Sequence, residues 1–291
     1  MPRYLDPKAD VVFKKIFGDH PHLLISFLNA VLPLEPDSLI VELSYLPTEQ
    51  VPEIPEFRRT IADVKCKDCK GRVFIVEMQM NWNDSFKQRL LFGASQAYVK
   101  QLGKGEDFNL LQPVYGLGLI AEIYEKTIPE WYHHYQLVKK GNAYGDVIEH
   151  LQLIFIELPK FPLESSDEKQ LRLLWLRFLR EIDEKTDTVS KELLDVPEIA
   201  EAITLAKESA YTPGELTIYE SYWDQVSREK TLMSGKFAEG RAVGEARGEA
   251  RGEEQATHRI AKSMLACGIE VDIITKSTGL TREEVEKIRG C

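Results

Sequence analysis

Hydrophobic positions recur with two different periods along the chain, and each period predicts a different kind of element. Between residues 6 and 32 the apolar residues recur every three or four positions, which predicts two short helices separated by a break from Gly18 to Pro21. From Ser38 to Leu46 apolar and polar residues alternate, which predicts a strand. The proline-bearing segment that follows is expected to form a loop.

Two further strands are predicted between Arg58 and Met80, in the sequence RRTIADVKCKDCKGRVFIVEMQM, where a polar turn near Lys70 separates two apolar segments. Polar residues nevertheless stand inside both segments. Asp63 lies within the first predicted strand, and Glu77 and Gln79 lie near the end of the second. A hairpin this apolar is expected to bury much of its surface, so its acids require an explanation.

The pattern beyond the hairpin alternates between helical and extended segments. It predicts a helix that begins at Asn83 or Asp84 and ends near Gln101. Two nearly continuous apolar runs, Pro113–Tyr124 and His150–Leu158, predict strands buried on both faces. From Ser165 onward the chain is predicted to be helical, with capping boxes at Ser165/Glu168, Thr212/Glu215 and Thr281/Glu284.

This order of elements predicts an α/β fold, in which a mixed central sheet is flanked by helices and followed by a helical C-terminal extension. We expect residues 1–160 to form the core and residues 161–235 to form a helical extension. Residues 236–291 are expected to contain a glycine-repeat helix or linker and a small helical segment.

The glycine repeat lies in EGRAVGEARGEARGEE, where Gly240, Gly244, Gly248 and Gly252 recur every four residues. Glycine destabilises a helix interior by about 1 kcal/mol per site, so the segment is either a weak helix or a flexible linker. A stripe of glycines also permits two helices to approach closely, which allows a homodimer through the C-terminal region. The residues beyond it are expected to form short helices, either as a helix-turn-helix or as a small bundle without DNA binding.

Composition narrows the class of protein. Hydrophobic residues make up 43% of the chain and charged residues 29%, as in ordinary globular proteins. No apolar run approaches the roughly 18 residues of a membrane span, and the N-terminus has no signal-peptide pattern. The chain contains only 4 cysteines, which predicts reduced thiols and a cytoplasmic location. The net charge of −10 argues against nonspecific attraction to nucleic acid, but it leaves room for a local basic surface.

The acids of the hairpin are predicted to meet. If the turn centres near Lys70, Asp63 lies across from Glu77, and such partners have Cβ atoms about 4.5–5.5 Å apart. Two partly buried carboxylates repel each other, and a hard divalent cation such as Mg²⁺ resolves the conflict because it prefers oxygen ligands. The alternative is that both acids face solvent on the polar side of an ordinary hairpin.

The order of several motifs resembles a known family. An aspartate on one strand and Glu-X-Lys on the next is typical of the PD-(D/E)XK nuclease superfamily. More closely, DVVFKKIFGDHPHLLISFLNAVL, then Asp63, then IVEMQM, then SQAYVKQLGKGEDFNLLQPVYGLGLI resemble the Rpn family of recombination-promoting nucleases, also described as transposases. The resemblance covers about residues 5–125, and the glycine-repeat tail is also similar to tails in that family.

The resemblance implies a restriction-endonuclease-like core and a metal site. Asp63 and Glu77 would hold Mg²⁺, with Mn²⁺ as a substitute and the carbonyl of Met78 as a third ligand. Gln79 stands where the superfamily has lysine; its amide can orient a water or a phosphate oxygen but supplies no charge. Asp10 is a candidate third acid, or a helix-start acid that interacts favourably with the helix dipole.

Basic residues crowd the same hairpin. They are either a positive surface that docks DNA beside the metal site or a charged turn in solvent. The residues are Arg58, Arg59, Lys65, Lys67, Lys70 and Arg72. On the helix that follows, Gln96 is either a substrate-positioning residue or part of the helix surface. Cys66 and Cys69 lack a second pair at zinc-ligand spacing and are expected to be free turn cysteines.

These observations predict a metal-dependent DNA endonuclease that serves recombination or mobile-element processing, in which a water activated by the metal attacks phosphorus. The main alternative is a catalytically lapsed relative that binds DNA or self-associates through its helical tail. An RNase is a further alternative, because residues that hydrolyse a phosphodiester bond do not by themselves distinguish DNA from RNA. DNA is the expected partner, and no membrane is expected.

Overall fold

The computed structural model describes residues 3–47, 49–50, 60–61, 63–83, 85–141, 146–162 and 170–289. The chain divides into two compact units, Met1–Ser227 and Arg228–Cys291. The candidate site lies in the first unit, so that unit is described first.

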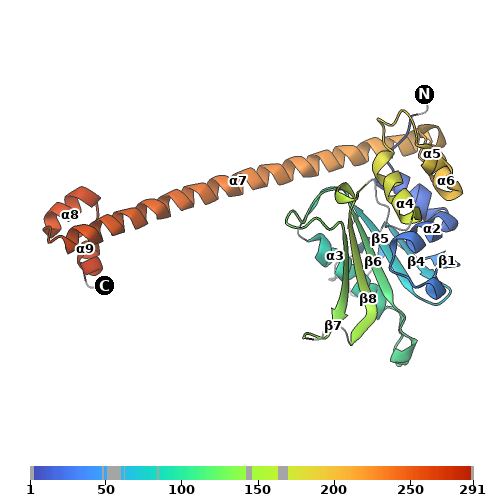
Figure 1. Ribbon diagram of the computed structural model, residues 1–291, viewed down its shortest axis with the longest axis horizontal. Helices are drawn as coiled ribbons and strands as arrows, with labels where there is room; N and C mark the ends of the chain where they lie inside the picture. Colours follow the sequence, from blue (N-terminus) through green and yellow to red (C-terminus); the bar gives the residue numbers. More distant parts are fainter. Residues whose placement is uncertain are drawn as a thin grey trace. The chain divides into compact units, whose positions relative to one another are not determined.

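A six-stranded mixed sheet forms the centre of the first unit, with the strand order β1-β4-β5-β6-β8-β7 (Figure 1). Strands β5, β6 and β8 are parallel, whereas β4 pairs antiparallel with β5 and β7 pairs antiparallel with β8. The strands are β1 (Leu43–Tyr45), β4 (Val64–Asp68), β5 (Val73–Gln79), β6 (Val114–Ile120), β7 (Tyr132–Val138) and β8 (Val147–Glu157). A separate two-stranded sheet pairs β2 (Glu49–Gln50) with β3 (Thr60–Ile61).

Helices cover both faces of this sheet, which confirms the predicted α/β class. The helices of this unit that precede α7 are α1 (Asp10–Phe13), α2 (Pro21–Val31), α3 (Phe86–Val99), α4 (Gln170–Glu181), α5 (Lys191–Leu194) and α6 (Pro197–Leu205). A π-helical turn, Lys14–Gly18, continues α1. In Figure 1, α3 lies on one side of the sheet and α2 and α4 lie on the other.

Alternation along β5 explains the two layers. Val73 and Ile75 belong to the apolar cluster that contains α3, whereas Phe74 and Val76 belong to the larger cluster that contains α1, α2 and α4. Each face of the strand therefore buries one set of side chains, as the nearly continuous apolar sequence predicts.

Two glycines of β6 let α3 lie close to the sheet. A Cβ on Gly118 would lie 2.9 Å from Cε1 of Phe86, and one on Gly116 would lie 3.2 Å from Cγ of Leu90. The first contact is shorter than real Cβ atoms show and the second is tighter than most, so glycine at these positions lets α3 lie close above β6.

Several expected elements differ from the structure. The strand predicted over Ser38–Leu46 is reduced to β1, because a 3₁₀ turn occupies Pro36–Ser38. Strand β7 was not predicted; its half-buried and exposed residues lack the apolar run of its neighbours because it lies at the edge of the sheet. Further 3₁₀ turns occur at Phe108–Leu110, Leu158–Lys160 and Glu208–Ala210.

Two predicted capping boxes are confirmed. The hydroxyl of Thr212 accepts from the N–H of Glu215, whose carboxylate accepts from the N–H of Thr212 at 2.7 Å. Thr281 and Glu284 form the same reciprocal pair. The third predicted box, at Ser165 and Glu168, lies outside the described residues.

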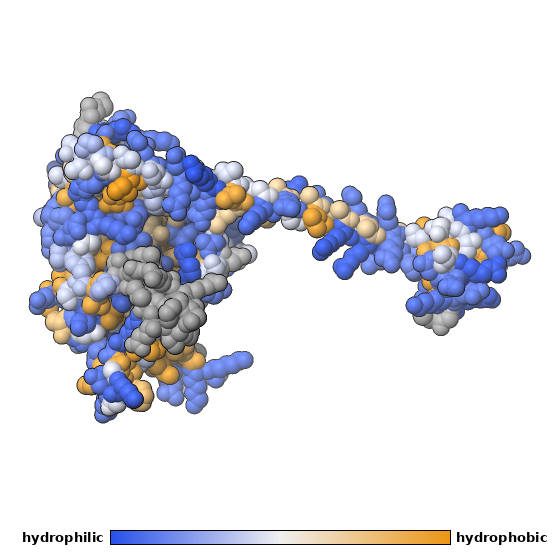
Figure 2. All heavy atoms as spheres, turned by 180° about the vertical axis from the view of Figure 1, so that it is seen from behind, coloured by the Kyte–Doolittle hydropathy of each residue, from blue (hydrophilic) through white to orange (hydrophobic). Residues whose placement is uncertain are grey.

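The second unit contains the end of α7 (Pro213–Ala266), α8 (Val271–Thr278) and α9 (Arg282–Arg289). The glycine repeat is helical and lies within α7. Ala261, Ile274 and Val285, one from each helix, form the small core of this unit. Figure 2 shows a mostly hydrophilic surface over this unit, with apolar residues in small groups. Across the described residues, no helix is long and apolar enough to cross a membrane.

Candidate active site

The register of the hairpin brings Asp63 and Glu77 together. Val64 pairs with Val76 at the end of the β4–β5 ladder, and Asp63 and Glu77 directly follow this pair at the open end, where the charge of Asp63 acts on Glu77. The N–H of Met78 donates a hydrogen bond to Oδ2 of Asp63, which fixes this carboxylate against the end of β5. The expected juxtaposition of the two acids is therefore confirmed.

Both acids are poorly solvated. Glu77 is only 9% exposed, which rules out the alternative of a freely solvated polar face. Burial and, to a smaller extent, the neighbouring charge of Asp63 together raise the pKa of Glu77 to about 7, while Arg89 opposes the shift. Burial likewise raises the pKa of Asp63 to about 6, against the lowering effect of the Met78 N–H, and Asp10 adds to the rise.

Asp10 lies near this pair on α1. Its carboxylate forms an ion pair with Lys14, with 2.8 Å between Oδ1 and Nζ, and both side chains are about two-fifths exposed (40% and 42%). The charges of Asp10 and Lys14 act on Asp63 in opposite directions. The structure thus places Asp10 close to the acids, and its role as a third acid remains a prediction.

Gln79 is buried and its amide makes two hydrogen bonds within the chain. Its Oε1 accepts from Nη2 of Arg89 at 2.6 Å, and its Nε2 donates to the carbonyl of Asn81. Asn81 is itself buried and donates to the carbonyl of Val226 at 3.0 Å. Gln79 is therefore held rigidly, one residue beyond Met78 and on the same face of β5 as Glu77.

The basic residues of the hairpin do not form a single exposed surface, which corrects the prediction for two of them. Arg72 is buried and paired with Asp68, with 2.7 Å between Nη2 and Oδ2. Lys65 is also buried, and burial lowers its pKa. Lys65 lies within β4, whereas Arg72 directly precedes β5 and is neutralised by Asp68.

Lys67 and Lys70 are exposed, and Nζ of Lys70 donates to the carbonyl of Asp37 at 3.0 Å. They lie toward the turn, and Lys67 is four residues from Asp63, a separation of roughly 13 Å along the strand. Arg58 and Arg59 lie outside the described residues.

Arg89 is the functional candidate that sequence reasoning missed. It lies on α3, which packs on the opposite face of the sheet to α1; it is exposed, and its charge acts on both Asp63 and Glu77. No local motif marks it, because its partners are on another element. The only available signal is its position one turn after Phe86, on the flank of the buried helix face. Gln96 lies two turns further along α3 and is half-buried; its role as a substrate-positioning residue remains a prediction.

The donors at this site fit one oxygen-ligated divalent cation. Asp63 and Glu77 supply two carboxylates, and the half-buried Met78 supplies a backbone carbonyl beside them. Within the described ranges, no group of three or more histidine, cysteine, aspartate or glutamate residues is arranged to hold a metal. Cys66 and Cys69 are free cysteines, as predicted, and burial raises the pKa of the Cys66 thiol to about 12.

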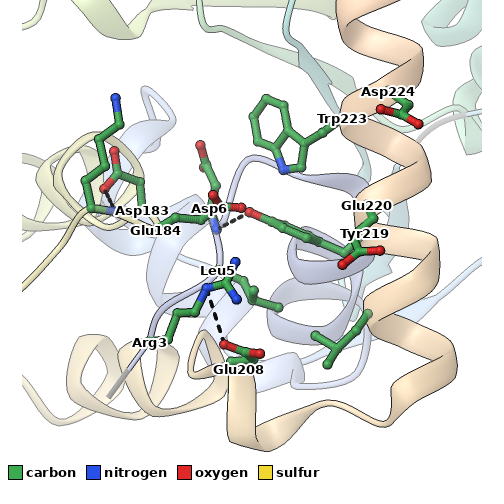
Figure 3. Close-up of a pocket in the computed structure, with 12 residues that line it drawn as sticks. Arg3, Leu5, Asp6, Asp183, Glu184, Glu208, Tyr219, Glu220, Trp223 and Asp224 are labelled. Carbon is green, nitrogen blue, oxygen red and sulfur yellow. Dashed lines mark hydrogen bonds and ion pairs between the residues drawn. The ribbon is translucent and has the colours of Figure 1, made fainter. Parts of the chain in front are cut away.

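A separate pocket lies between the N-terminal segment, residues 183–185 and the start of α7 (Figure 3). There the hydroxyl of Tyr219 accepts from the N–H of Asp6 at 3.0 Å, and Arg3 pairs with Glu208 at 3.4 Å. Neither Asp63 nor Glu77 lines this pocket. This pocket is therefore distinct from the acid site, and its polar groups connect the N-terminal segment with the helices.

A family model described as "PD-(D/E)XK nuclease family transposase" matches residues 7–233. The chain belongs to this family. A second model, described as "Rpn/YhgA-like nuclease family, C-terminal HTH domain", matches residues 254–290. No curated protein and no solved structure gives a significant match.

Both matches agree with the expected resemblance. The match to the PD-(D/E)XK nuclease family transposases supports a nuclease-type function for the unit that contains Asp63 and Glu77. The second match decides between the two interpretations of the C-terminal helices in favour of a helix-turn-helix, which indicates DNA binding. The turn between α8 and α9 carries Gly279 at φ +74°, the left-handed conformation that glycine readily adopts at a helix end.

Proposed function

We propose that the chain is a metal-dependent DNA endonuclease that hydrolyses phosphodiester bonds, with Asp63 and Glu77 as the metal ligands. The observation that carries this proposal is that the carboxyl group of the buried Glu77 lies beside that of the half-buried Asp63, in surroundings that raise their pKa values to about 7 and about 6. Acids in such a site are unfavourable as charged groups unless a cation binds them. A purely structural role does not explain two neighbouring acids at this end of the hairpin, because each raises the free energy of the folded chain when it is charged.

The ligand set favours Mg²⁺, with Mn²⁺ as a substitute, because both bind carboxylate and carbonyl oxygens. When bound, such an ion lowers the pKa of a water and stabilises the charge that develops on the phosphate. Asp63 is oriented by the N–H of Met78, which donates to its Oδ2, and its charge acts on Glu77. Glu77 is positioned by β5 itself, at the end of the strand beside the carbonyl of Met78.

DNA is the favoured substrate because the same chain carries a helix-turn-helix. In such motifs the second helix enters the major groove, and here that helix is α9, with exposed Lys287 and Arg289 in its last turn. Cleavage by one unit and binding by the other accord with a role in recombination or mobile-element processing. The free thiols of Cys66, Cys69 and Cys267 accord with a reducing, cytoplasmic location.

Plasmid nicking tests this function. The purified chain is incubated with supercoiled DNA and with Mg²⁺, Mn²⁺, Ca²⁺ or EDTA, beside Asp63→Ala and Glu77→Ala. We expect nicking with Mg²⁺ or Mn²⁺ and a loss of at least about 100-fold in both variants, because each removes one ligand. Nicking by both variants at the parent rate would show that these acids are not the site.

A second candidate function is DNA binding by a catalytically lapsed member of the family. It is favoured by one observation: Gln79 occupies the position where the superfamily pattern has lysine. DNA binding by the parent without nicking under any metal condition would support this candidate over the nuclease.

A further inference from the structure

The acid site lacks the positive charge that its sequence pattern leads one to expect on β5. Gln79 is neutral, and both ends of its amide are already bonded within the chain, to Arg89 and to the carbonyl of Asn81. These two bonds fix the amide with its oxygen toward the guanidinium. Gln79 is therefore better placed to hold Arg89 than to act on a substrate itself.

Arg89 is held by Gln79 at one end of its guanidinium and is otherwise accessible to solvent. One nitrogen, Nη2, lies 2.6 Å from Oε1 of Gln79, while the residue as a whole is exposed. Its guanidinium also lies over the ring of Phe86, 5.4 Å from the ring centre, which limits its movement. A guanidinium has five N–H donors, so donors remain for a second oxygen ligand. Across the described residues, Arg89 forms no ion pair with a carboxylate.

Among the described residues, the other cations of this region are paired, stacked on a ring or far from the acids; Lys67, for example, lies roughly 13 Å from Asp63 along the strand. Arg72 is buried against Asp68, and Lys14 pairs with Asp10. Lys87, two residues before Arg89, lies over the ring of Tyr124 at 4.4 Å. Within the part of the chain that the structure describes, Arg89 is thus the cation that combines exposure with a hydrogen bond to Gln79, the residue at the lysine position.

We propose that Arg89, anchored by Gln79, is the cation that contacts the scissile phosphate at the acid site. The inference rests on the proposed function for its catalytic consequence. Its binding consequence can be measured even if the protein cuts no DNA. A planar guanidinium suits this contact because it offers paired donors to phosphate oxygens.

The binding experiment uses the full chain and a short DNA duplex with Ca²⁺ in place of Mg²⁺, over a series of salt concentrations. We expect Arg89→Gln to weaken binding and to reduce the slope of log K against log salt by about 0.9, the value for one lost phosphate contact. Lys100→Gln, at the C-terminal cap of α3, is the matched control because it removes one exposed charge at the far end of this helix. We expect it to behave as the parent.

The cleavage experiment relocates the charge. We expect Arg89→Gln to lower the single-turnover nicking rate by about 100-fold, and Arg89→Lys to retain part of the rate. In the double variant Arg89→Gln/Gln79→Lys, a lysine stands at the position of the superfamily pattern. We expect it to recover at least about tenfold over Arg89→Gln, which a purely structural role of Arg89 does not predict.

The outcomes separate the two proposals. If the parent cuts no DNA but Arg89→Gln loses one phosphate contact, the nuclease function fails and the contact stands. If the parent cuts and Arg89→Gln binds and cuts equally well, the contact is overturned and the function stands. The contact is also overturned if Lys100→Gln reproduces the binding loss. It is overturned as well if the double variant Arg89→Gln/Gln79→Lys nicks DNA no faster than Arg89→Gln.

Discussion

Glu77 is unfavourable for folding as a charged group, and under the proposed function it is a metal ligand. It stands near the end of an otherwise apolar strand, is 9% exposed, and faces another acid. Because burial disfavours the charged form, its pKa lies at about 7 in the folded chain, above its ordinary value of 4.5. The strand therefore tolerates Glu77 most easily when the carboxyl group is protonated or neutralised by a cation.

This environment predicts a gain in stability on removing the charge. Both acids have raised pKa values, so their favourable contribution is fully present below about pH 4 and is lost as the pH rises through about 6 and 7. We expect Asp63→Asn and Glu77→Gln to stabilise the metal-free chain at pH 8 by roughly 1–3 kcal/mol each, and to have little effect at pH 4. Urea unfolding in EDTA measures the difference, and an equal or lower stability at pH 8 would contradict it.

The same shifts predict how activity depends on pH. A divalent cation binds the deprotonated acids, so metal affinity and nicking are expected to be weak below pH 6 and to rise as the pH passes through 7. Mn²⁺ binding, measured at each pH as the rise in the unfolding midpoint that the ion causes, tests this prediction without requiring cleavage. A flat profile between pH 5 and pH 8 would show that the acids are already ionised at pH 5.

Arg72 and Arg89 show that charge in the sequence does not predict charge at the surface. Arg72 belongs to the crowded basic hairpin, yet it is buried and paired with Asp68. Arg89 stands outside any basic cluster, yet it is exposed and bonded to Gln79. Whether each guanidinium is available to a ligand depends on its partner, and the partner of Arg89 is brought to it only by the folding of the chain.

At the scale of elements, the glycines of β6 decide where α3 lies and so where Arg89 points. The ring of Phe86 occupies the space above Gly118 that a side chain would fill. Phe86 and Arg89 are one turn apart on α3, so a shift of this ring moves the guanidinium as well.

We therefore expect Gly118→Ala to reduce both stability and site function. The added Cβ would lie 2.9 Å from Phe86 and 3.0 Å from Phe155, and overpacking of this kind costs about 1–3 kcal/mol. Urea unfolding and the salt dependence of DNA binding measure the two effects. Gly240→Ala is the matched control, since nothing lies within 4 Å of the added Cβ there. A Gly118→Ala chain as stable as its parent would show that α3 adjusts freely.

The glycine repeat behaves differently from the glycines of β6. Gly244 and Gly248 lie inside α7, and a Cβ at either position would meet nothing within 4 Å. Their effect on the helix is therefore expected to be that of propensity alone, about 1 kcal/mol per site. We expect Gly244→Ala to slow amide hydrogen exchange of the surrounding turns about fivefold, as a gain of that size implies. Exchange at the parent rate would indicate that another interaction already holds this segment.

At the scale of the molecule, the chain joins a nuclease-family unit to a helix-turn-helix. The family match to residues 7–233 contains the acids, and the second match covers residues 254–290. The C-terminal core is small, with Ala261, Ile274 and Val285 at its centre. Binding and cleavage are therefore expected to be separable by mutation.

We expect the double substitution Lys287→Gln/Arg289→Gln to weaken binding of duplex DNA by at least about tenfold at moderate salt, since two phosphate contacts are lost. The single-turnover nicking rate at saturating DNA is expected to stay at the parent value. Filter binding and nicking on the same preparations test both parts. A fall in the saturated rate would show that α9 acts on the cleavage step as well as on binding.

Much of the fold and the centre of the site could be predicted from local patterns. The turn near Lys70 and the two-residue period of the flanking strands determine that Asp63 meets Glu77, because a hairpin register depends only on neighbouring residues. The capping boxes at Thr212 and Thr281 are likewise local and were correctly predicted. Strand β7 was missed because an edge strand lacks the apolar run that marks a buried one.

The sequence by itself determined the α/β class, the paired acids and the missing lysine at Gln79, since each depends on residues close together in the chain. Only the tertiary structure decided which cations remain accessible and where they point. It buried Lys65 and Arg72 and set Arg89 of α3 against Gln79 of β5. The physical reason is that exposure and charge pairing depend on the packing of separate elements, and no local period records that packing.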